Sequence, residues 1–465
     1  MVRTYLAWVL AAAAAGALLA VLWPVRAGSP EERRAIEAGR VVITYWDRHS
    51  GHEHEARVRL FDEYNRTQGV VDGVYVRALP IGYNMEKMLT AIAGSAPPDL
   101  CSLEGTVLVA LAPQGCFLPI GDRMAASPHL REEAFFPHTW KAVSYDGRVY
   151  GVPTTCDTMC LLWNKSAFRR AGLDPERPPQ TIAELEEYAG RLTIHSETGF
   201  DQIGFLPWLP WDLSHMWGGL FGGVWFDDAS GRAVNGADPR IIASLEWQRS
   251  FSVDPRRSDN PPHAMDPARI AAFRSGFGAY MSANTPFYSG KVAMITEGEW
   301  QVTFIPKYAP DLDWGVAPIP QPEGAPPRCY STSCVADAIP ANCRHPEEAW
   351  KVIEWLYAPR PGTTRSPASD YAREISNIPC RRAEALDERF MGDPKFRVFV
   401  EELLNKPAVS YPVTPAAQVM LDEIERQREY VVFHQTTPEA ASQTIERTAN
   451  AEIERIEGLL EQVRP

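Results

Sequence analysis

Short apolar runs alternate with amphipathic stretches from residue 41 onward. Residues 41–46 are β-branched and aromatic, which predicts a strand, whereas residues 54–65 place apolar side chains at helical spacing. Two further strands are predicted over residues 74–76 and 100–103, with a helix over residues 85–92 between them. This β-α-β-α-β order predicts a largely parallel sheet covered by helices, the α/β class.

Polar and aromatic side chains follow the first and third of these strands. The strand ends are residues 46–49 (Trp-Asp-Arg-His) and residues 102–106, which contain Glu104. Open parallel sheets bind ligands in the crevice beyond the carboxyl ends of their strands. We therefore expect the side chains at these two ends to face a ligand.

A second series of elements begins after Gly151-Val152-Pro153. We expect strands over residues 159–163, 204–206, 291–295, 313–319 and 335–339. We expect helices over residues 181–192, 239–251, 300–305, 346–357 and 437–462. Thr181 is the expected N-cap of the first of these helices, because Glu184 follows it three residues later.

The first 27 residues are typical of a targeting segment. Arg3 precedes an uncharged run from Tyr5 to Trp23, and Val25-Arg26-Ala27 offers small residues for cleavage. The run is also long enough to span a bilayer, so residues 1–27 are either a signal peptide or an N-terminal membrane anchor. Both alternatives place the rest of the chain outside the cytoplasm, in the periplasm or at the cell surface.

The composition narrows the choice of partners. With 46 Lys and Arg against 59 Asp and Glu, the net charge is −13, and no basic stripe stands out, so nucleic acid is not expected as a partner. Fourteen tryptophans supply many flat apolar side chains. The eight cysteines are compatible with disulfides in an exported chain. Cys101/Cys116 and Cys329/Cys334 are the better local pairs, and buried free thiols are the alternative.

Several motifs together resemble the extracellular solute-binding proteins of ABC importers. They occur in order along nearly the whole mature chain, and the closest likeness is to the sugar-binding, maltose-binding-like branch. The motifs are Tyr45-Trp46-Asp47, residues 88–99, Tyr150 to Pro153 with Leu162 to Lys165, Gly290 to Met294 with Gly298-Glu299-Trp300, and Pro346 to Trp350.

The resemblance implies a two-lobe periplasmic binding protein fold of the type II kind, with a ligand cleft between lobes joined by crossing strands. Lobe I would take residues 41–154 and 317–358, and lobe II residues 155–316 and 359–465. Such lobes close on their ligand by rotating about a hinge. The implied partners are a small-molecule ligand, which we expect to be a carbohydrate, and the permease subunits of a transporter in the membrane. We expect a monomer without a cofactor.

The expected ligand-binding residues follow from the chemistry of sugars and from the family's motif positions. A pyranose offers apolar C–H faces to flat aromatic rings and hydroxyl pairs to planar polar groups. Trp300 stands where the family places a stacking aromatic, next to Glu299. The full expected set is Trp300, Glu299, Trp46, Asp47, Arg48, Glu104, Asp157, Trp208, Trp211, Tyr330 and Tyr411.

Three alternatives stay open. The same fold can bind a polyamine, a glycerol phosphate or a metal, or can serve a sensor kinase instead of a transporter. Asp47, Glu104 and Glu299 can also be considered as paired carboxylates of a glycosidase. No local catalytic motif favours an enzyme, however, and His49, His52 and His54 do not share one helical face, which disfavours a metal.

Overall fold

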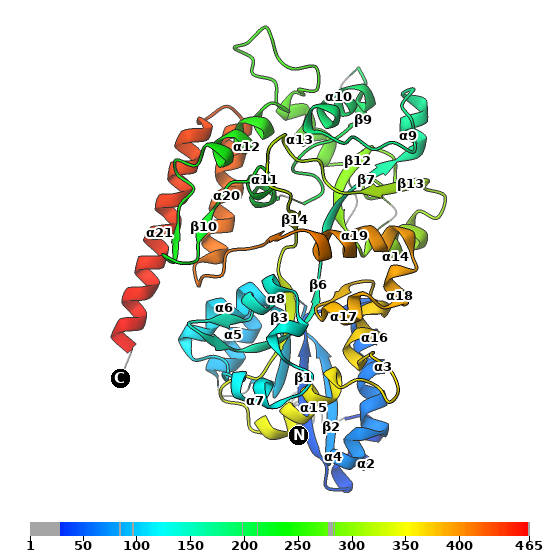
Figure 1. The fold of residues 1–465 in the computed structure, drawn as a ribbon, viewed down its shortest axis with the longest axis vertical. Helices are drawn as coiled ribbons and strands as arrows, with labels where there is room; N and C mark the ends of the chain where they lie inside the picture. Colours follow the sequence, from blue (N-terminus) through cyan, green and yellow to red (C-terminus); the bar gives the residue numbers. More distant parts are fainter. Residues whose placement is uncertain are drawn as a thin grey trace, which may run out of the picture.

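Each half of the molecule is built on its own β-sheet. The computed structural model describes residues 28–463, apart from 83–84, 95–96, 198, 212, 278–281 and 283. A six-stranded sheet occupies one end of the long axis and a three-stranded sheet the other (Figure 1). This arrangement is the expected two-lobe α/β fold.

The six-stranded sheet has the order β16-β6-β15-β3-β1-β2. Its strands are β1 (Val41–Asp47), β2 (Val74–Pro80), β3 (Leu100–Glu104), β6 (Gly151–Cys156), β15 (Cys334–Ala338) and β16 (Ile378–Pro379). Strand β1 is parallel to β2 and β3, whereas β15 is antiparallel to both β3 and β6. The sheet is therefore mixed, because β15 enters it from the opposite end after crossing from the other lobe.

The three-stranded sheet is antiparallel and has β7 (Met159–Asn164) at its centre. Strands β12 (Met294–Gly298) and β13 (Trp314–Ala317) flank it. Four short ladders complete the strands: β4 (Ser144–Tyr145) with β5 (Arg148–Val149), β8 (Ile194–His195) with β9 (Phe200–Gln202), β10 (Phe226–Asp227) with β11 (Arg232–Ala233), and β14 (Cys329–Tyr330) with β17 (Ala408–Val409).

Helices surround both sheets. Those of the first half of the chain are α2 (Pro30–Glu37), α3 (Gly51–Arg66), α4 (Gln68–Asp72), α5 (Met85–Ala93), α6 (Gly105–Leu111), α7 (Gly121–Ala126), α8 (Pro137–Lys141), α9 (Lys165–Arg170), α10 (Ile182–Leu192) and α11 (Ser214–Leu220). The others are α12 (Pro239–Arg249), α13 (Pro267–Arg274), α14 (Gln301–Tyr308), α15 (Pro346–Tyr357), α16 (Pro367–Glu374), α17 (Arg382–Ala385), α18 (Glu388–Met391), α19 (Pro394–Asn405), α20 (Ala417–Val432) and α21 (Pro438–Val463).

Local sequence explains where many elements begin and which face they bury. In α15, Ala349, Val352, Ile353 and Leu356 repeat at helical spacing and are all fully buried. The expected N-cap of α10 is confirmed, because the Thr181 hydroxyl accepts a hydrogen bond from the Glu184 N–H. Sequence-level reasoning of this kind works where a helix carries its own periodicity and cap.

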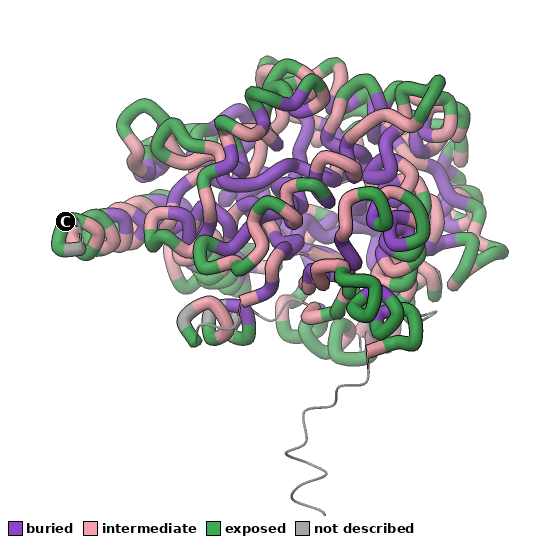
Figure 2. Tube along the Cα trace, turned by 90° about the horizontal axis from the view of Figure 1, so that it is seen from below, coloured by how far each residue is buried: buried purple, intermediate pink, exposed green. Residues whose placement is uncertain are grey.

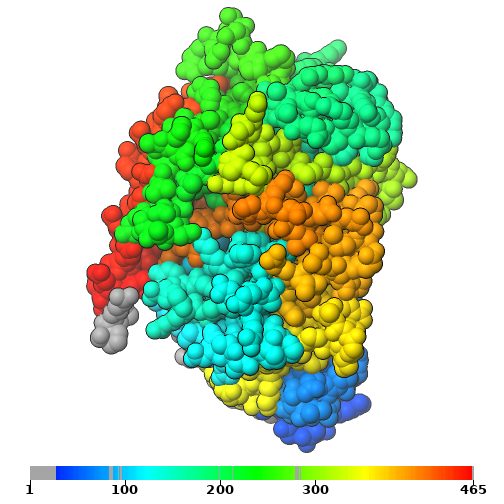
Figure 3. Space-filling model, viewed as in Figure 1, coloured from blue at the N-terminus to red at the C-terminus, as the bar shows by residue number. Residues whose placement is uncertain are grey.

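The chain crosses between the halves at several points. Strand β6 runs directly into β7, the segment after β14 leads into β15, and the chain after β16 returns through α17 and α18 to α19. Buried residues run through the middle of the molecule, whereas the far end of α21 projects from the body (Figure 2). In the space-filling view, the segment around α19 and the residues that follow it lies across the middle of one face (Figure 3).

Some expectations about elements were wrong. Residues 204–206 are not a strand, because the pairing there ends at the isolated bridge between Ile203 and Val292. Strand β12 begins at Met294, three residues beyond the expected start, since Lys291 and Val292 hydrogen-bond to Pro286 instead. Residues 367–379 were expected in the second lobe, but α16 packs on α3 and β16 pairs with β6, so this segment lies with the first sheet.

The expected targeting segment, residues 1–27, lies outside the described residues. None of the helices that the structure does describe combines the length and the apolar character needed to cross a bilayer.

Candidate functional site

The carboxyl ends of β1, β3 and β6 meet the start of β15 at the edge of the six-stranded sheet that faces the other lobe. The register places Glu104 and Thr155 on either side of Val335. The first residues beyond these strands, Arg48 and Asp157, therefore lie at the junction between the lobes. This is the edge at which an open α/β sheet presents its ligand-binding side chains.

Asp47 organises the end of β1 from a fully buried position. Its carboxylate accepts hydrogen bonds from the His49 N–H at 3.1 Å and from the Ser102 hydroxyl at 3.2 Å, and lies 3.0 Å from Nδ1 of His54. Burial opposes ionisation, but the hydrogen bonds from His49 and His54 hold the pKa of Asp47 below its ordinary value. Asp47 thus fixes the strand end from inside the protein.

Next to Asp47, an ion pair spans the ends of two strands. Nη2 of Arg48 lies 2.6 Å from Oε1 of Glu104, and the Glu104 side chain keeps 30% of its surface exposed. Beside them, the ring of half-buried Trp46 lies 5.3 Å from the ammonium group of Lys87. Arg48 and Glu104 present a planar, charged pair of the type that binds hydroxyl groups.

Two carboxyl groups, half-buried Asp157 and fully buried Glu299, hold together the segments that cross between the lobes. Asp157 accepts hydrogen bonds from both the N–H (2.8 Å) and the hydroxyl of Thr332. Glu299 accepts one from the Thr158 N–H and one from Nδ2 of Asn377, each at 3.0 Å. These bonds join the β6–β7 crossing to the segment before β15 and to the loop before β16.

The pKa values of both carboxyl groups are raised by their surroundings. Burial raises the pKa of Asp157 to about 6, although the hydrogen bonds from Thr332 oppose the rise. Burial and the nearby charge of Asp157 raise the pKa of Glu299 well above its ordinary value. Both carboxyl groups are therefore protonated more easily than in water, and Asp157 titrates just below neutral pH.

Tyr330, which is fully buried, and Tyr411 lie side by side. Their ring centroids are 6.5 Å apart, and the ring of His215 lies within 6.1 Å of Tyr330 and 5.8 Å of Tyr411. Burial and then the charges of Asp157 and other nearby acids, Glu104 among them, raise the pKa of Tyr411. Tyr411, Asp157 and Glu104 thus share one region of the lobe junction.

Trp208 has a different environment. Its side chain is buried, and the guanidinium carbon of Arg428 on α20 lies 5.5 Å from its ring centroid. The contact matches a cation–π interaction within the protein.

A cavity of about 310 Å³ opens in the second lobe beside β12. Aromatic rings form much of its wall, and the carboxyl group of Glu297 and the amide of Gln301 supply polar groups. Its lining residues are Leu209, Pro210, Trp211, Arg274, Phe277, Thr285, Pro286, Phe287, Tyr288, Ile295, Glu297 and Gln301. A cavity of this size, with flat apolar walls and few polar groups, is typical of a small-ligand site.

Glu297 is the polar centre of this cavity. Burial raises its pKa to about 7, against hydrogen-bond interactions with Trp211, the Gly298 N–H, Gln301 and Trp300. Gln301 in turn accepts a hydrogen bond from the Tyr288 hydroxyl at 2.5 Å. The carboxyl group can therefore act as donor or acceptor near neutral pH.

Trp300 begins the turn into α14, directly after β12. Its ring lies flat against Gly298, where an added Cβ would come within 2.2 Å of Cζ3, so a side chain at position 298 would displace the indole. Trp211 and Trp300 thus approach Glu297 from two different segments of the second lobe.

The structure brings the expected residues together in groups rather than in one ring. Trp211 and Trp300 gather at the Glu297 cavity; Arg48, Glu104, Asp157, Tyr330 and Tyr411 lie at the lobe junction; Asp47 and Glu299 bond to protein groups there. Sequence reasoning missed Glu297, Tyr288 and Gln301. Glu297 and Gln301 flank the Gly298-Glu299-Trp300 motif, and that proximity is the only signal in the sequence that could have drawn attention to them.

Neither of the expected local pairs, Cys101/Cys116 and Cys329/Cys334, is joined in the structure, in which the cysteines are in the reduced form. Cys101 donates a hydrogen bond to the Ala338 carbonyl at 3.4 Å, and Cys329 donates one to the Lys406 carbonyl at 3.6 Å. Among the described residues, no group of three or more His, Cys, Asp or Glu side chains is placed to hold a metal ion.

Comparison with known proteins connects this arrangement to a family. Residues 59–394 match the family described as bacterial extracellular solute-binding protein. The sn-glycerol-3-phosphate-binding periplasmic protein UgpB of Brucella abortus is 24% identical over 296 residues, which cover 62% of this chain and 63% of that protein. UgpB of Escherichia coli K12 is 23% identical over 329 residues, 68% of this chain and 69% of that protein. The match thus spans less than two thirds of the Brucella relative.

Solved structures resemble the chain over most of its length. CpMnBP1 with mannotriose bound is 29% identical, with a TM-score of 0.73 over 88% of this chain and 100% of that one. The sugar-binding protein MalE of Xanthomonas citri is 21% identical, with a TM-score of 0.71 over 91% of this chain and 100% of that one, and shares the fold.

Proposed function

The chain belongs to the bacterial extracellular solute-binding proteins, and we propose that it is the extracytoplasmic substrate-binding component of an ABC transporter that captures a sugar or oligosaccharide between its lobes. The ligand would then pass to the membrane permease when the lobes reopen. Hinge closure about the crossing segments is the motion that such two-lobe proteins use.

One observation carries the choice of a sugar: the cavity that Trp211, Tyr288 and Glu297 form in the second lobe. Flat rings match the C–H faces of a pyranose, and the carboxyl and amide groups match its hydroxyls. The 29% identity to CpMnBP1, whose structure contains mannotriose, supports the same class of ligand. We propose that Trp300, Trp46, Arg48, Glu104 and Tyr411 contribute further contacts around the cleft, whereas Trp208 and Tyr330 are buried in the protein and support the site from behind.

A second candidate is sn-glycerol-3-phosphate, because the curated relatives carry that name. A phosphate needs free cationic or N–H donors. At the lobe junction Arg48 is paired with Glu104, and Asp157 and Glu299 add acidic groups. Among its described lining residues, the cavity itself has one cationic side chain, Arg274, and the carboxyl group of Glu297; because these charges oppose each other, a neutral polyol fits the site better than an anion.

We also propose how the chain divides into lobes, its oligomeric state and its location. We propose lobes of residues 41–154 with 317–358 and of residues 155–316 with 359–465, except that residues 359–379 join the first lobe, because α16 packs on α3 and Arg360 pairs with Glu63 of α3. We propose a monomer, exported by the segment over residues 1–27 and free or tethered by it, which binds its ligand without chemical turnover. Nucleic acid is not among its partners.

A thermal-shift screen tests this proposal. The purified protein is heated with mono- and oligosaccharides, polyamines and phosphate esters. A ligand at 100 times its Kd adds about 2.7 kcal/mol to the free energy of unfolding, which raises the melting temperature measurably. A rise with one sugar class supports the proposal, whereas a rise only with sn-glycerol-3-phosphate or a polyamine would replace the sugar with that solute.

A further inference from the structure

Three cysteines from three adjacent strands meet beneath the lobe junction. Cys156 ends β6, Cys334 begins β15, and Cys380 follows β16; their side chains are 3%, 2% and 0% exposed. The strand register places Cys156 directly opposite Cys334 on one side and opposite Ile378 on the other. All three strands lie where the chain passes between the lobes.

The position of Cys380 brings its sulfur to Cys156. The Cys380 N–H donates to the Thr154 carbonyl at 3.1 Å, which continues the β16–β6 ladder by one position. Because residues two apart point to the same face of a strand, Cys380 lies on the face of Cys156. Its thiol hydrogen-bonds with the thiols of both Cys156 and Cys334.

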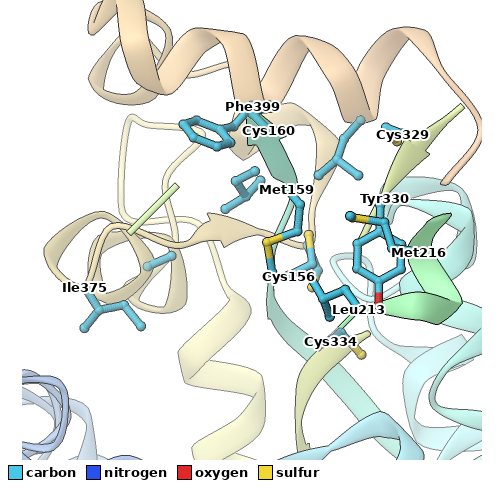
Figure 4. Packing of buried hydrophobic residues seen from close by; sticks show 14 of the residues in the cluster. Cys156, Met159, Cys160, Leu213, Met216, Cys329, Tyr330, Cys334, Ile375 and Phe399 are labelled. Carbon is cyan, nitrogen blue, oxygen red and sulfur yellow. The ribbon is translucent and has the colours of Figure 1, made fainter. Parts of the chain in front are cut away.

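The third thiol has another partner. Cys334 donates a hydrogen bond from its sulfur to the Thr139 carbonyl at 3.6 Å. Figure 4 shows Cys156 and Cys334 among the packed apolar side chains of this region, with Met159 beside them. Among the described hydrogen bonds, neither Cys156 nor Cys380 donates from its sulfur to a backbone carbonyl. These two thiols of the group therefore face each other.

We propose that Cys156 and Cys380 are joined by a disulfide bond in the exported protein. Members of the extracellular solute-binding family work in compartments where disulfides form and persist. The bond would tie the strand that leads into the second lobe to the segment that returns from it, and would leave the β15 connection untied.

The reaction needs a disulfide donor, either a thiol–disulfide oxidoreductase or a small-molecule disulfide. One cysteine thiolate attacks the donor disulfide, forms a mixed disulfide and releases one donor thiolate. The second cysteine thiolate then attacks the sulfur of the first and displaces the other donor thiolate. The two cysteines lose two protons and two electrons, and the donor disulfide becomes two thiols. Because both sulfurs are buried, the step belongs to folding, before β16 closes the sheet.

Peptide mapping of the unreduced protein tests the bond. The full chain is purified without reductant, denatured, alkylated and digested with trypsin at low pH. We expect the peptide over residues 149–165 linked to the peptide over residues 374–381, which contains Cys380 as its only cysteine, and we expect reductant to separate the two. In denaturant, the number of free thiols should be two fewer than the number of cysteines. Alkylated Cys380, or Cys380 linked to any other peptide, would overturn the proposal.

Variants with single cysteines replaced distinguish this disulfide from bonds between other cysteines. Cys160→Ser leaves Cys156 as the only cysteine of the 149–165 peptide, and the link should persist; Cys116→Ser should again show two thiols fewer than its cysteine content. Cys380→Ser should show every remaining cysteine as a free thiol. Reductant should lower the melting temperature of the wild type and of Cys116→Ser but not that of Cys380→Ser; an equal fall in all three would contradict the proposal. If Cys380→Ser does not fold, the wild-type peptide map alone decides.

Discussion

Glu297 shows how burial creates a binding group from an ordinary side chain. The carboxyl group is 1% exposed, and its pKa lies near 7 rather than at 4.5, because water is excluded while the hydrogen bonds only partly compensate for the loss. A carboxyl group poised in this way can donate to one sugar hydroxyl and accept from another. The aromatic rings around it supply the apolar contacts.

Replacing Trp211 by alanine should weaken sugar binding. The loss of a stacked ring and of its buried surface corresponds to roughly 1–3 kcal/mol, or about a 5- to 150-fold higher Kd. Calorimetric titration of both proteins measures this change. Trp350→Ala is the matched control, since Trp350 lies half-buried on α15 in the other lobe, and its affinity should stay unchanged. Equal affinities of Trp211→Ala and wild type would remove Trp211 from the site.

Glu297 should also make stability depend on pH. Its folded-state pKa is raised, so the folded protein holds this proton more tightly than the unfolded chain between pH 4.5 and about 7. The stabilising contribution is therefore complete below pH 4.5 and is lost as the pH rises through about 7. Melting temperatures measured from pH 5 to 8 should fall more for the wild type than for Glu297→Gln. Parallel curves for the two proteins would contradict the assigned environment.

Trp211 and Trp300 were predicted from the sequence as ligand-binding residues, but Glu297 was not. The two tryptophans stand at positions where relatives of the family carry aromatic residues, so their likeness was visible in the sequence. Glu297 lies inside an apolar strand, Met-Ile-Thr-Glu-Gly, and the sequence does not show whether such a residue faces solvent or a cavity. Only the packing of segments 209–211 and 285–288 around β12 creates the cavity.

The segments that cross between the lobes are joined by side-chain hydrogen bonds as well as by backbone. Asp157 bonds to Thr332, and Glu299 bonds to Thr158 and Asn377, so two carboxyl groups link four separate parts of the chain. Such buried acceptors stabilise the junction only while all their partners are present.

A double-mutant cycle on Glu299 and Asn377 measures this linkage. Glu299→Ala leaves the Thr158 N–H and the Asn377 amide without an acceptor, which should cost about 1–3 kcal/mol in the free energy of unfolding. Because the two residues share a hydrogen bond, the double variant should lose less than the sum of the single losses. Denaturant unfolding of the four proteins gives these values. Strictly additive losses would show that the two side chains do not interact.

A helix or strand could be predicted from the sequence where its own residues carry an apolar pattern. Strand β1 and helix α15 were predicted because each carries its own apolar pattern. Strand β16 is only two residues long and left no local pattern, whereas α16 begins with a capping box at Ser366 that the sequence analysis did not use. The resemblance placed the lobe boundary after residue 358, and the contacts of α16 with α3 and of β16 with β6, which are long-range in the sequence, move the segment that follows it to the first lobe.

Across the whole molecule, the two lobes touch near the hinge and also away from it. His52 of α3 packs against Phe304 of α14 at 5.6 Å between ring centroids, and Thr303 hydrogen-bonds with Ser376. Lys141 and Asp228 form an exposed ion pair between the first lobe and the β10–β11 turn. Contacts of this kind are weak singly, which suits an interface that has to open and close.

The proposed role implies binding without turnover. Glu104 and Glu299 are the carboxylates that a glycosidase would need, but Glu299 is fully buried and bonded to Thr158 and Asn377. Incubation with aryl glycosides should therefore release no phenol above the buffer rate. Hydrolysis that disappears in Glu104→Gln or Glu299→Gln would overturn the binding role.

The most direct test of the central proposal is an equilibrium titration of the purified protein by calorimetry, with mannobiose, mannotriose and maltose, and with sn-glycerol-3-phosphate in parallel. The account predicts saturable, one-to-one binding of at least one oligosaccharide that Trp211→Ala weakens, and no comparable binding of the phosphate ester. Tight binding of sn-glycerol-3-phosphate with no response to any of the sugars would contradict it.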